Sequence, residues 1–401
     1  MKRYDLITPE GTRDLLFEEC LARRSVERRL KELFARIGYS EVVTPGLEFF
    51  DVFNGSTRNF RTENLYKTFD SKGRIIVMRP DSTIPIARLV ATRLKDTVMP
   101  LRLYYNQRIY ENNALLKGRS DETVQAGIEL IGGNNSKRAD YEVLCTAVDA
   151  LAMFDKDNFR LELGHIGYFK ELVAKLGVDE DVREEIRMLI STKNYPALND
   201  LLATFGDNEV TRALKQLPRL FGGAEVFEKA ESIYNDDKIK AILTDLKEEY
   251  ERLTGLGYEG KISVDLGIVS HTDYYTGIVF KGYLSEVGKY VLNGGRYDNL
   301  ISEFGFDSPA VGFGVDVDAV ARHLAKIGGG FTPKTADILV HGDEGCDVAA
   351  FKYVSELSES GKVVEYSLFD SFEESAEYAK KKGIPEIVRV DKDNNKITTR
   401  I

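Results

Sequence analysis

Cysteine and histidine are both scarce in this sequence of 401 residues. The three cysteines are Cys20, Cys145 and Cys346, and the four histidines are His165, His271, His323 and His341. The cysteines are odd in number and far apart, so neither a disulfide framework nor a zinc site with paired cysteines is predicted. No histidine has a second metal ligand at helical spacing. We therefore expect buried free thiols and no structural metal.

Long apolar runs are also missing. No stretch approaches the roughly 18 apolar residues that are needed to span a bilayer. The basic N-terminus lacks the apolar segment and the cleavage site of a secretory signal. These absences predict a cytoplasmic protein without membrane association. The net charge is −10, and because phosphate contacts dominate nucleic-acid affinity, this charge disfavours a large RNA interface.

The chain is long enough for about two or three compact units. Apolar positions recur at helical spacing from Phe17 to Ile37 and Gly38 follows, which predicts a long amphipathic helix. A short strand is predicted at Glu41–Pro45, and its proline suits the edge of a sheet. Further predicted strands, spaced as in hairpins, are Arg74–Met78, Arg102–Tyr105, Val124–Ile131, Arg160–Glu162, Ile262–Val269, Tyr274–Tyr283 and Tyr290–Leu292. This order favours an antiparallel sheet.

Three changes of pattern divide the chain. Helical periodicity with little strand signal predicts a helical insertion at about residues 168–256. Glycines followed by Pro333 predict a linker at residues 326–334. Beyond it, strands and helices alternate, at Asp337–His341, Asp347–Glu359, Lys362–Tyr366, Phe372–Lys382 and Glu386–Asp391. We therefore predict a main domain at residues 1–325 and a small parallel α/β domain at residues 335–401.

Two motifs carry polar groups that could hold a small ligand. Arg79-Pro80-Asp81-Ser82-Thr83 puts a carboxylate and hydroxyls between a strand and a helix, where they could bind an ammonium group. Taken alone, these residues are better explained as helix caps. In the strand that holds Gln125, Gly127 and Glu129, alternation puts the three on one face, with room for a ligand at the glycine. An exposed sheet face would give the same pattern.

Two later motifs are weaker by themselves. Asp273-Tyr274-Tyr275-Thr276-Gly277 supplies aromatic side chains for the walls of a pocket, although tyrosines in strands more often serve packing. The segment Asn293–Leu300, with Gly294 and Gly295 near its start, predicts a glycine turn that leads into a helix.

In their common order, the four motifs resemble those of the catalytic domain of histidyl-tRNA synthetases over about residues 5–325. Arg-Pro-Asp-Ser-Thr is similar to that family's Arg-Pro-Glu-Gly-Thr, and Gln-Ala-Gly-Ile-Glu matches its Gln-x-Gly-x-Glu. Asp-Tyr-Tyr-Thr-Gly and Gly-Gly-Arg-Tyr-Asp match histidine-specific segments. The resemblance implies an α+β fold of the class II aminoacyl-tRNA synthetase type, with an antiparallel sheet flanked by helices. A fold does not by itself imply an activity.

The resemblance also implies a histidine-binding pocket. Its residues would be Asp81, Thr83, Gln125, Glu129, Tyr274, Tyr275 and Tyr297. In the family, the positions of the first three hold the α-amino group, whereas those of Glu129 and Tyr275 hold the imidazole and that of Tyr297 forms the pocket wall. Asp81 is one methylene shorter than the family's glutamate.

Three arginines of the synthetases are missing. A gap-free alignment places Glu111 at the arginine of the second class II motif, although a shifted alignment would offer Arg108. Ser270 replaces an arginine specific to the histidine enzymes, and Ala319 replaces the ATP-stacking arginine of the third motif. Adenylate formation joins two anions, and arginine is suited to neutralising them. We therefore expect no catalytic residues and no cofactor. Whether Glu111 and Arg119 line a pocket is open.

The C-terminal region resembles only the start of the synthetases' anticodon-binding domain, because it stops at Ile401 after the third predicted strand. From Lys334 onward, 10 Lys and Arg face 14 Asp and Glu, a net charge of −4. A tRNA would find little to bind there.

A histidine pocket without ATP chemistry resembles the regulatory subunits that accompany short-form ATP phosphoribosyltransferase, the first enzyme of histidine biosynthesis. The resemblance implies a non-catalytic chain that its catalytic partner needs for activity and for feedback inhibition by histidine. It also implies a homodimer, built on the Phe17–Ile37 helix and the Pro45 strand, within a larger hetero-oligomer. Two alternatives are a divergent histidyl-tRNA synthetase and a free-standing histidine sensor.

Overall fold

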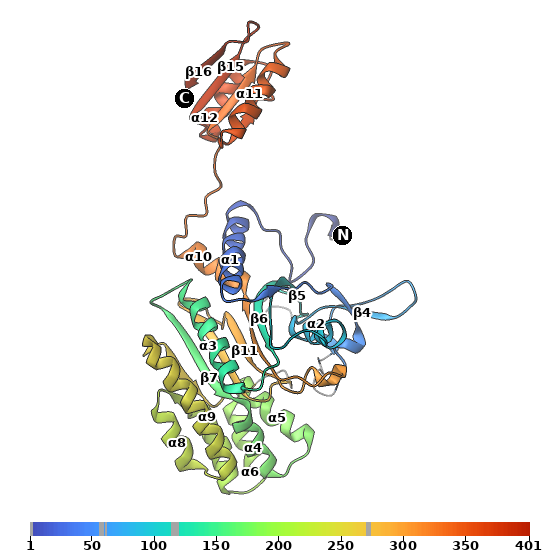
Figure 1. Cartoon of the computed structure of the whole chain (residues 1–401), viewed down its shortest axis with the longest axis vertical. Helices are drawn as coiled ribbons and strands as arrows, with labels where there is room; N and C mark the ends of the chain where they lie inside the picture. Colours follow the sequence, from blue (N-terminus) through green and yellow to red (C-terminus); the bar gives the residue numbers. More distant parts are fainter. Residues whose placement is uncertain (1–2, 56–59, 61, 114–119, 270–273) are drawn as a thin grey trace. The chain divides into compact units, whose positions relative to one another are not determined.

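The computed structural model describes residues 3–55, 60, 62–113, 120–269 and 274–401. The chain forms two compact units, Met1–Gly330 and Phe331–Ile401, and each is described by itself (Figure 1). No helix in the described part of the chain has the length and apolar character needed to cross a membrane.

The first unit is built on a sheet with the strand order β1-β5-β6-β12-β11-β10-β7-β9-β8. The strands are β1 (Ser40–Glu41), β5 (Leu101–Tyr110), β6 (Glu122–Ile131), β7 (Phe159–His165), β8 (Phe221–Gly222), β9 (Ile262–Asp265), β10 (Ile278–Leu284), β11 (Leu292–Arg296) and β12 (Ala310–Asp316). Neighbours are antiparallel as predicted, except that β1 pairs with β5 and β7 pairs with β9 in parallel. Both exceptions join strands that are connected by long crossovers rather than by hairpins.

Several predicted bounds in this sheet are wrong, since β9 ends at Asp265 rather than at Val269 and β11 begins at Leu292 rather than at Tyr290. The strand predicted at Tyr274–Tyr283 begins only at Ile278, so Tyr274 and Tyr275 lie in the segment before β10. The predicted glycine turn is the interior of β11, where a Cβ at Gly294 would lie 2.3 Å from the carbonyl oxygen of Gly312. The glycines therefore serve close packing within the sheet rather than a turn. The next helical element is a 3-10 turn, η7 (Ser302–Phe304), rather than an α-helix.

Three helices pack on the apolar face of this sheet, namely α1 (Phe17–Arg36), α3 (Ser136–Ala152) and α10 (Val317–Lys326). Helix α1 is the predicted amphipathic helix, and the ring of Phe34 lies 6.0 Å from that of Phe313 on β12. Arg23 on α1 forms a 2.7 Å ion pair with Asp318 on α10. The other oxygen of Asp318 accepts the N–H of Val124 at 2.8 Å. One buried carboxylate thus joins α1, α10 and β6.

Six helices follow β7 and precede β9. They are α4 (Ile166–Leu176), α5 (Glu180–Ser191), α6 (Tyr195–Ala203), α7 (Glu209–Gln216), α8 (Glu225–Ile233) and α9 (Asp237–Leu253). Helix α9 begins at an N-cap in which Asp236 accepts the N–H of Ile239 at 2.9 Å. It then packs against α3, β7 and β9, so the two helices α3 and α9 lie side by side (Figure 1).

A separate three-stranded sheet has the order β2-β4-β3, formed by Leu47–Phe49, Ile75–Met78 and Lys67–Phe69. The strand predicted at Arg74–Met78 belongs to this small sheet, and the chain leaves it to enter α2 (Thr83–Leu89). The buried guanidinium of Arg79 donates to the backbone oxygens of Thr44, Pro45 and Arg108. Arg79 thus joins the small sheet to β5 and fixes the start of α2.

The second unit contains β13 (Ile338–Gly342), α11 (Asp347–Glu359), β14 (Val364–Tyr366), α12 (Phe372–Lys382), β15 (Glu386–Val390) and β16 (Lys396–Arg400). Both helices match their predicted bounds, and β14, β13 and β15 are parallel as predicted. The prediction of three strands is wrong, because β16 adds an antiparallel edge strand beside β15. All five residues of β16 are exposed, so the sequence lacks the alternation of buried and exposed residues that would have identified this strand.

Gly312 offers a test of the packing within the large sheet. A Cβ at this position would lie 1.9 Å from a carboxyl oxygen of Glu129 and 2.3 Å from the carbonyl oxygen of Ile128. We expect Gly312→Ala to lower the free energy of unfolding by about 2 kcal/mol or more, because a backbone neighbour must move. Thermal unfolding measures the change. Gly288→Ala, at an exposed glycine with no heavy atom near its Cβ, is the matched control. Equal unfolding midpoints for the two variants would contradict the close approach.

Candidate functional site

The carboxyl group of Glu129 lies at the centre of the candidate site. Glu129 stands on β6 and is 1 % exposed. The hydroxyl of Thr83, at the start of α2, donates to its Oε1 at 2.7 Å, and the hydroxyl of Tyr297, after β11, donates to its Oε2. Burial raises the pKa of Glu129 to about 8, although both hydrogen bonds act in the opposite direction. A pKa of about 8 favours the protonated form of Glu129 at neutral pH.

Asp81 supplies a second buried carboxyl group to the same site. Its Oδ1 accepts the N–H of Ile84 at 2.8 Å, so the residue does cap α2, as the alternative interpretation of this motif predicted. Burial raises the pKa of Asp81 to about 6, against the effect of hydrogen bonds from the backbone and from Tyr274. In turn, the charge of Asp81 contributes to the raised pKa of Glu129. A ligand cation between Asp81 and Glu129 would favour the ionised form of each carboxyl group and so lower both pKa values.

No lysine or arginine in the described ranges forms an ion pair with Asp81 or Glu129. Buried carboxylates are ordinarily paired with a cation or held by a metal. Nor does any group of three or more His, Cys, Asp and Glu in the described ranges have the arrangement of a metal site. The two carboxyl groups are therefore suited to a small organic cation.

Three buried tyrosines enclose the carboxyl groups. The rings of Tyr274 and Tyr275 lie 4.8 Å apart, and those of Tyr274 and Tyr297 lie 5.7 Å apart. The side chain of Lys170, on α4, donates to the carbonyl oxygen of Tyr275 at 2.8 Å. The segment before β10 is thereby held against α4, and the residues expected to form aromatic walls do come together.

Gln125 is brought to the site by Tyr105, a residue that the motifs did not identify. The Tyr105 hydroxyl donates to Oε1 of Gln125 at 3.2 Å. A Cβ at Gly127 would lie 2.6 Å from the same hydroxyl, so the space above this glycine is filled by Tyr105. The expectation that Gly127 leaves room for a ligand is thus wrong. Tyr105 lies opposite Gly127 across β5 and β6, a large residue beside a small one, and this register is visible only in the structure.

The positions of the missing arginines present no cation in the described part of the chain. Glu111 is exposed just after β5, where its N–H donates to the carbonyl oxygen of Asp121. Ala319 is buried in the first turn of α10, and its N–H donates to Asp316, whose other oxygen pairs with Lys289 at 2.6 Å. Ser270 lies outside the described residues. Arg119 does too.

Arg108, the alternative at the second motif, forms a 2.9 Å ion pair with Glu122 on the neighbouring strand. Its charge is therefore already engaged by a carboxylate.

Side chains of the Gly-Gly-Arg-Tyr motif make contacts on both faces of the sheet. On one face Tyr297 contacts Glu129, and on the other Arg296 forms a 2.7 Å ion pair with Asp140 on α3. The guanidinium also donates to the carbonyl oxygen of Ser136 at 3.0 Å and pairs with Asp298 at 2.8 Å. The end of β11 therefore joins the candidate site to the first turn of α3.

Comparison with known proteins agrees with this arrangement. The family model described as histidyl-tRNA synthetase matches residues 11–320. A crystal structure of an ATP phosphoribosyltransferase regulatory subunit/histidyl-tRNA synthetase from Bacillus halodurans C has a TM-score of 0.82 and 28 % identity, and the match covers 97 % of this chain and 99 % of that chain. A histidyl-tRNA synthetase from Nostoc sp. PCC 7120 has a TM-score of 0.75 at 18 % identity, over 99 % and 97 % of the two chains. These matches confirm the predicted class II synthetase-like α+β fold.

Two curated relatives are similar over nearly their whole length, and both are named ATP phosphoribosyltransferase regulatory subunit. The one from Clostridium kluyveri is 41 % identical over 96 % of this chain and 99 % of its own. The one from Bacillus cereus (strain AH187) is 38 % identical over 98 % of this chain and 94 % of its own. With this identity and coverage, and with the synthetase-like fold beneath it, the chain belongs to the family of ATP phosphoribosyltransferase regulatory subunits.

Proposed function

We propose that this chain is the non-catalytic regulatory subunit of a short-form ATP phosphoribosyltransferase in the cytoplasm. It is required for the activity of its catalytic partner in the first step of histidine biosynthesis. It also binds histidine and transmits feedback inhibition to that partner. Family membership supports the regulatory role, and the carboxyl groups of Glu129 and Asp81 support the choice of ligand.

Histidine matches the chemistry of this site group by group. Its α-amino group is a cation for Asp81, with Thr83 and Gln125 nearby. Its imidazole can share the proton of Glu129, beside the ring of Tyr275, with Tyr274 and Tyr297 as walls. Because the site has two buried carboxyl groups, it favours a ligand with an ammonium group and a second protonatable group. The presence of two buried carboxyl groups in one site is the observation that carries the proposal.

The same site is poorly suited to ATP. Arginines stabilise the negative charge that develops during adenylate formation, and a glutamate and an alanine stand at two of their three positions. The acidic side chain of Asp316 lies beside Ala319. In our proposal the histidine half of an ancestral site is kept as a sensor, while its ATP half no longer functions and no cofactor is bound.

Inhibition requires that histidine bind one state of the assembly better than another, because only differential affinity shifts an equilibrium. The assembly that we propose is a homodimer within a hetero-oligomer that includes the catalytic subunits but no tRNA. Exposed apolar side chains on α1 and around the small sheet support the homodimer. They include Phe17, Val43 and Phe69, which are 72 %, 73 % and 70 % exposed.

The decisive experiment combines the full chain with a short-form phosphoribosyltransferase. We expect the two to co-purify, the partner to be active only in the complex, and histidine to inhibit that activity. Histidine-dependent ATP–pyrophosphate exchange at a normal rate would contradict the proposal and indicate a divergent synthetase. Histidine binding without co-purification or activation would instead indicate a free-standing sensor.

A substitution at Glu129 tests the ligand site. Glu129→Gln keeps the shape of the side chain but replaces a carboxyl group, which can pass its proton to the imidazole and become charged, with an amide that cannot, so we expect the Kd for histidine to rise about tenfold or more. Isothermal titration calorimetry on the full chain measures this. Glu122→Gln, on the same strand but paired with Arg108, is the matched control and should leave the Kd unchanged. An unchanged Kd in Glu129→Gln would place histidine elsewhere.

The pH dependence of stability tests the protonation of Glu129. Its pKa is about 8 in the folded chain, against an ordinary value of 4.5. The stability from this proton is fully present below about pH 4.5 and is lost as the pH rises through about 8. We expect the ligand-free protein to lose more stability than Glu129→Gln over this range, as followed by urea unfolding. Asp81 is present in both proteins, so its own titration remains in both curves. Parallel curves would show that Glu129 is ionised in the folded chain.

A further inference from the structure

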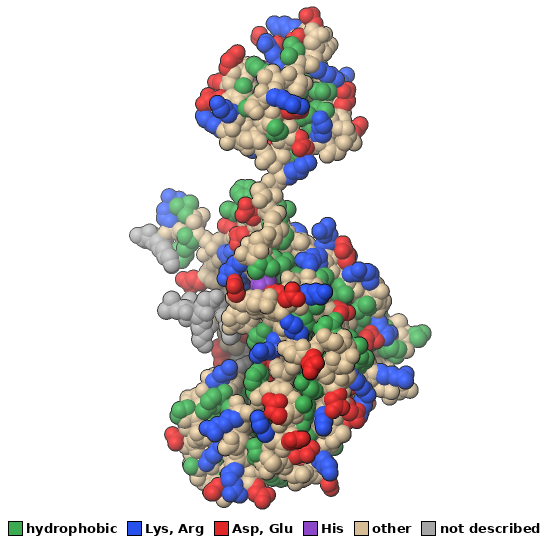
Figure 2. Space-filling model, turned by 90° about the vertical axis from the view of Figure 1, so that its left-hand side faces the viewer, with side chains coloured by type: hydrophobic (Ala, Val, Ile, Leu, Met, Phe, Trp, Pro, Cys, Tyr) green, Lys and Arg blue, Asp and Glu red, His purple; other side chains and the backbone are tan. Residues whose placement is uncertain are grey.

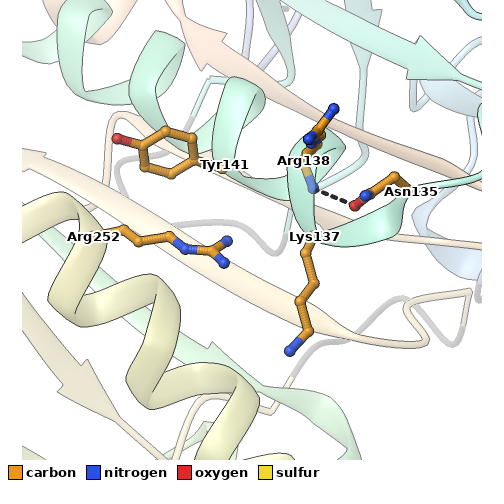
Figure 3. Close-up of a pocket in the computed structure, with 5 residues that line it drawn as sticks. All are labelled: Asn135, Lys137, Arg138, Tyr141 and Arg252. Carbon is orange, nitrogen blue, oxygen red and sulfur yellow. Dashed lines mark hydrogen bonds between the residues drawn. The ribbon is translucent and has the colours of Figure 1, made fainter.

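A cavity of about 440 Å³ lies between α3 and α9. Asn135, Lys137, Arg138 and Tyr141 line it from the N-terminal turns of α3, and Arg252 lines it from α9. In Figure 3 the side chain of Arg252 extends from α9 toward α3, and Lys137 points into the space between the two helices. This cavity is on the α3 side of the sheet, whereas Glu129 and Asp81 are on the other side. Its volume is in the range of small-molecule sites.

The lining side chains are cationic or neutral. Three of the five are Lys or Arg, and none of the lining residues is acidic. Carboxylates outside the lining hold two of these cations, since Lys137 lies 2.9 Å from Asp245 and 2.8 Å from Glu248, and Arg252 lies 2.9 Å from Glu249. Glu248 also lies 3.9 Å from the Arg252 guanidinium, so Lys137 and Arg252 both have carboxylate partners.

Arg138 forms no ion pair with any residue that the structure describes. It is exposed, and in Figure 3 its side chain points away from Lys137. Because a long exposed side chain changes rotamer readily, its guanidinium is available to a ligand in the cavity. Arginine is the side chain best suited to binding a phosphate group through two parallel hydrogen bonds.

The first turn of α3 carries charges opposite in sign to those usually found at a helix N-terminus. A helix N-terminus carries a partial positive charge, and sequences ordinarily place Asp or Glu there. The first turn of α3 has no acidic residue and instead carries Lys137 and Arg138. The cap is made by Asn135, whose side chain accepts the N–H of Arg138 at 3.0 Å. Asp245 and Glu248 balance the charge of Lys137, whereas Arg138 has no carboxylate partner among the described residues. A bound anion would offset the repulsion between Arg138 and the positive end of the helix.

We propose that this cavity binds a small phosphate-bearing molecule. Lys137, Arg138 and Arg252 meet its phosphate, and the ring of Tyr141, over which the Arg252 guanidinium lies at 5.9 Å, lines the space for an attached ring system. A long nucleic acid is disfavoured by the net charge of −10 and by the interspersed acidic and basic side chains on the visible face of the first unit (Figure 2). The same chemistry serves inorganic phosphate and a nucleoside monophosphate.

Calorimetric titration of the full chain with inorganic phosphate and with AMP tests the proposal. We expect at least one of them to bind with a Kd of about 1 mM or lower. Equal affinity for both identifies phosphate as the ligand, and tighter binding of AMP identifies a nucleotide; either result supports the site. Absence of binding by both at about 10 mM would overturn it.

Variants show whether the binding takes place in this cavity. Arg138→Ala removes a cation without breaking an ion pair in the described structure, and we expect it to raise the Kd about tenfold. Lys240→Ala is the matched control, because Lys240 is an exposed lysine on α9 that does not line the cavity. If a nucleotide is the ligand, Tyr141→Leu should weaken AMP and leave phosphate unchanged. Thermal unfolding confirms that each variant is folded. Equal affinity of Arg138→Ala and wild type, with both folded, would overturn the assignment.

Discussion

The burial of the Glu129 carboxyl group is the constraint on which the architecture of the candidate site depends. A carboxyl group that is 1 % exposed must have its hydrogen bonds supplied by the protein, because an unsatisfied one is costly. The partners come from distant parts of the chain, since Thr83 lies 46 residues before Glu129 and Tyr297 lies 168 residues after it. Satisfying this one group therefore fixes the start of α2 and the end of β11 relative to β6.

Arg296 extends that constraint through the sheet. It is the neighbour of Tyr297, and its guanidinium holds the first turn of α3 through Asp140 and the carbonyl oxygen of Ser136. A change in charge at Glu129 acts on one side of this strand end, and an anion at Lys137 or Arg138 acts on the other. The two proposed sites thus share a structural element, although coupling between them requires that this element have two states that each ligand distinguishes.

Much of the fold could be predicted from the sequence where a pattern reflects a buried face. Helix α1 was predicted because its apolar residues recur at helical spacing, and α11 and α12 were predicted from the alternation of helices with strands. Strand β16 was missed because it lies fully exposed at the edge of a sheet, although its run Ile397-Thr398-Thr399 has high strand propensity. The glycines of β11 were misassigned because a glycine required by a close neighbour looks the same in sequence as a glycine required by a turn.

Prediction of the candidate site from the sequence has a similar limit. Asp81, Thr83, Glu129 and the tyrosines were found through the resemblance to a family, and the structure brings them together. Tyr105 was missed because its role depends on its register opposite Gly127, which no local pattern reveals. The parallel pairs at β1 and β9 were missed for the same reason, since strand direction is set by long connections. Local chemistry is therefore visible in the sequence, whereas pairing between distant segments is not.

The charges in the candidate site determine which ligands it can bind. A pocket that forms an aminoacyl-adenylate must hold an amino acid, whose ammonium needs carboxylates, and ATP, whose phosphates need arginines. No lysine or arginine in the described structure pairs with Asp81, so its charge, once the group ionises, is balanced only by hydrogen bonds. Asp316 adds no free charge, because it caps α10 and pairs with Lys289. An uncompensated negative field repels a polyphosphate and attracts a small cation. In our proposal, the same substitutions that oppose ATP binding therefore favour a cationic amino acid, so that catalysis is lost without losing recognition of histidine.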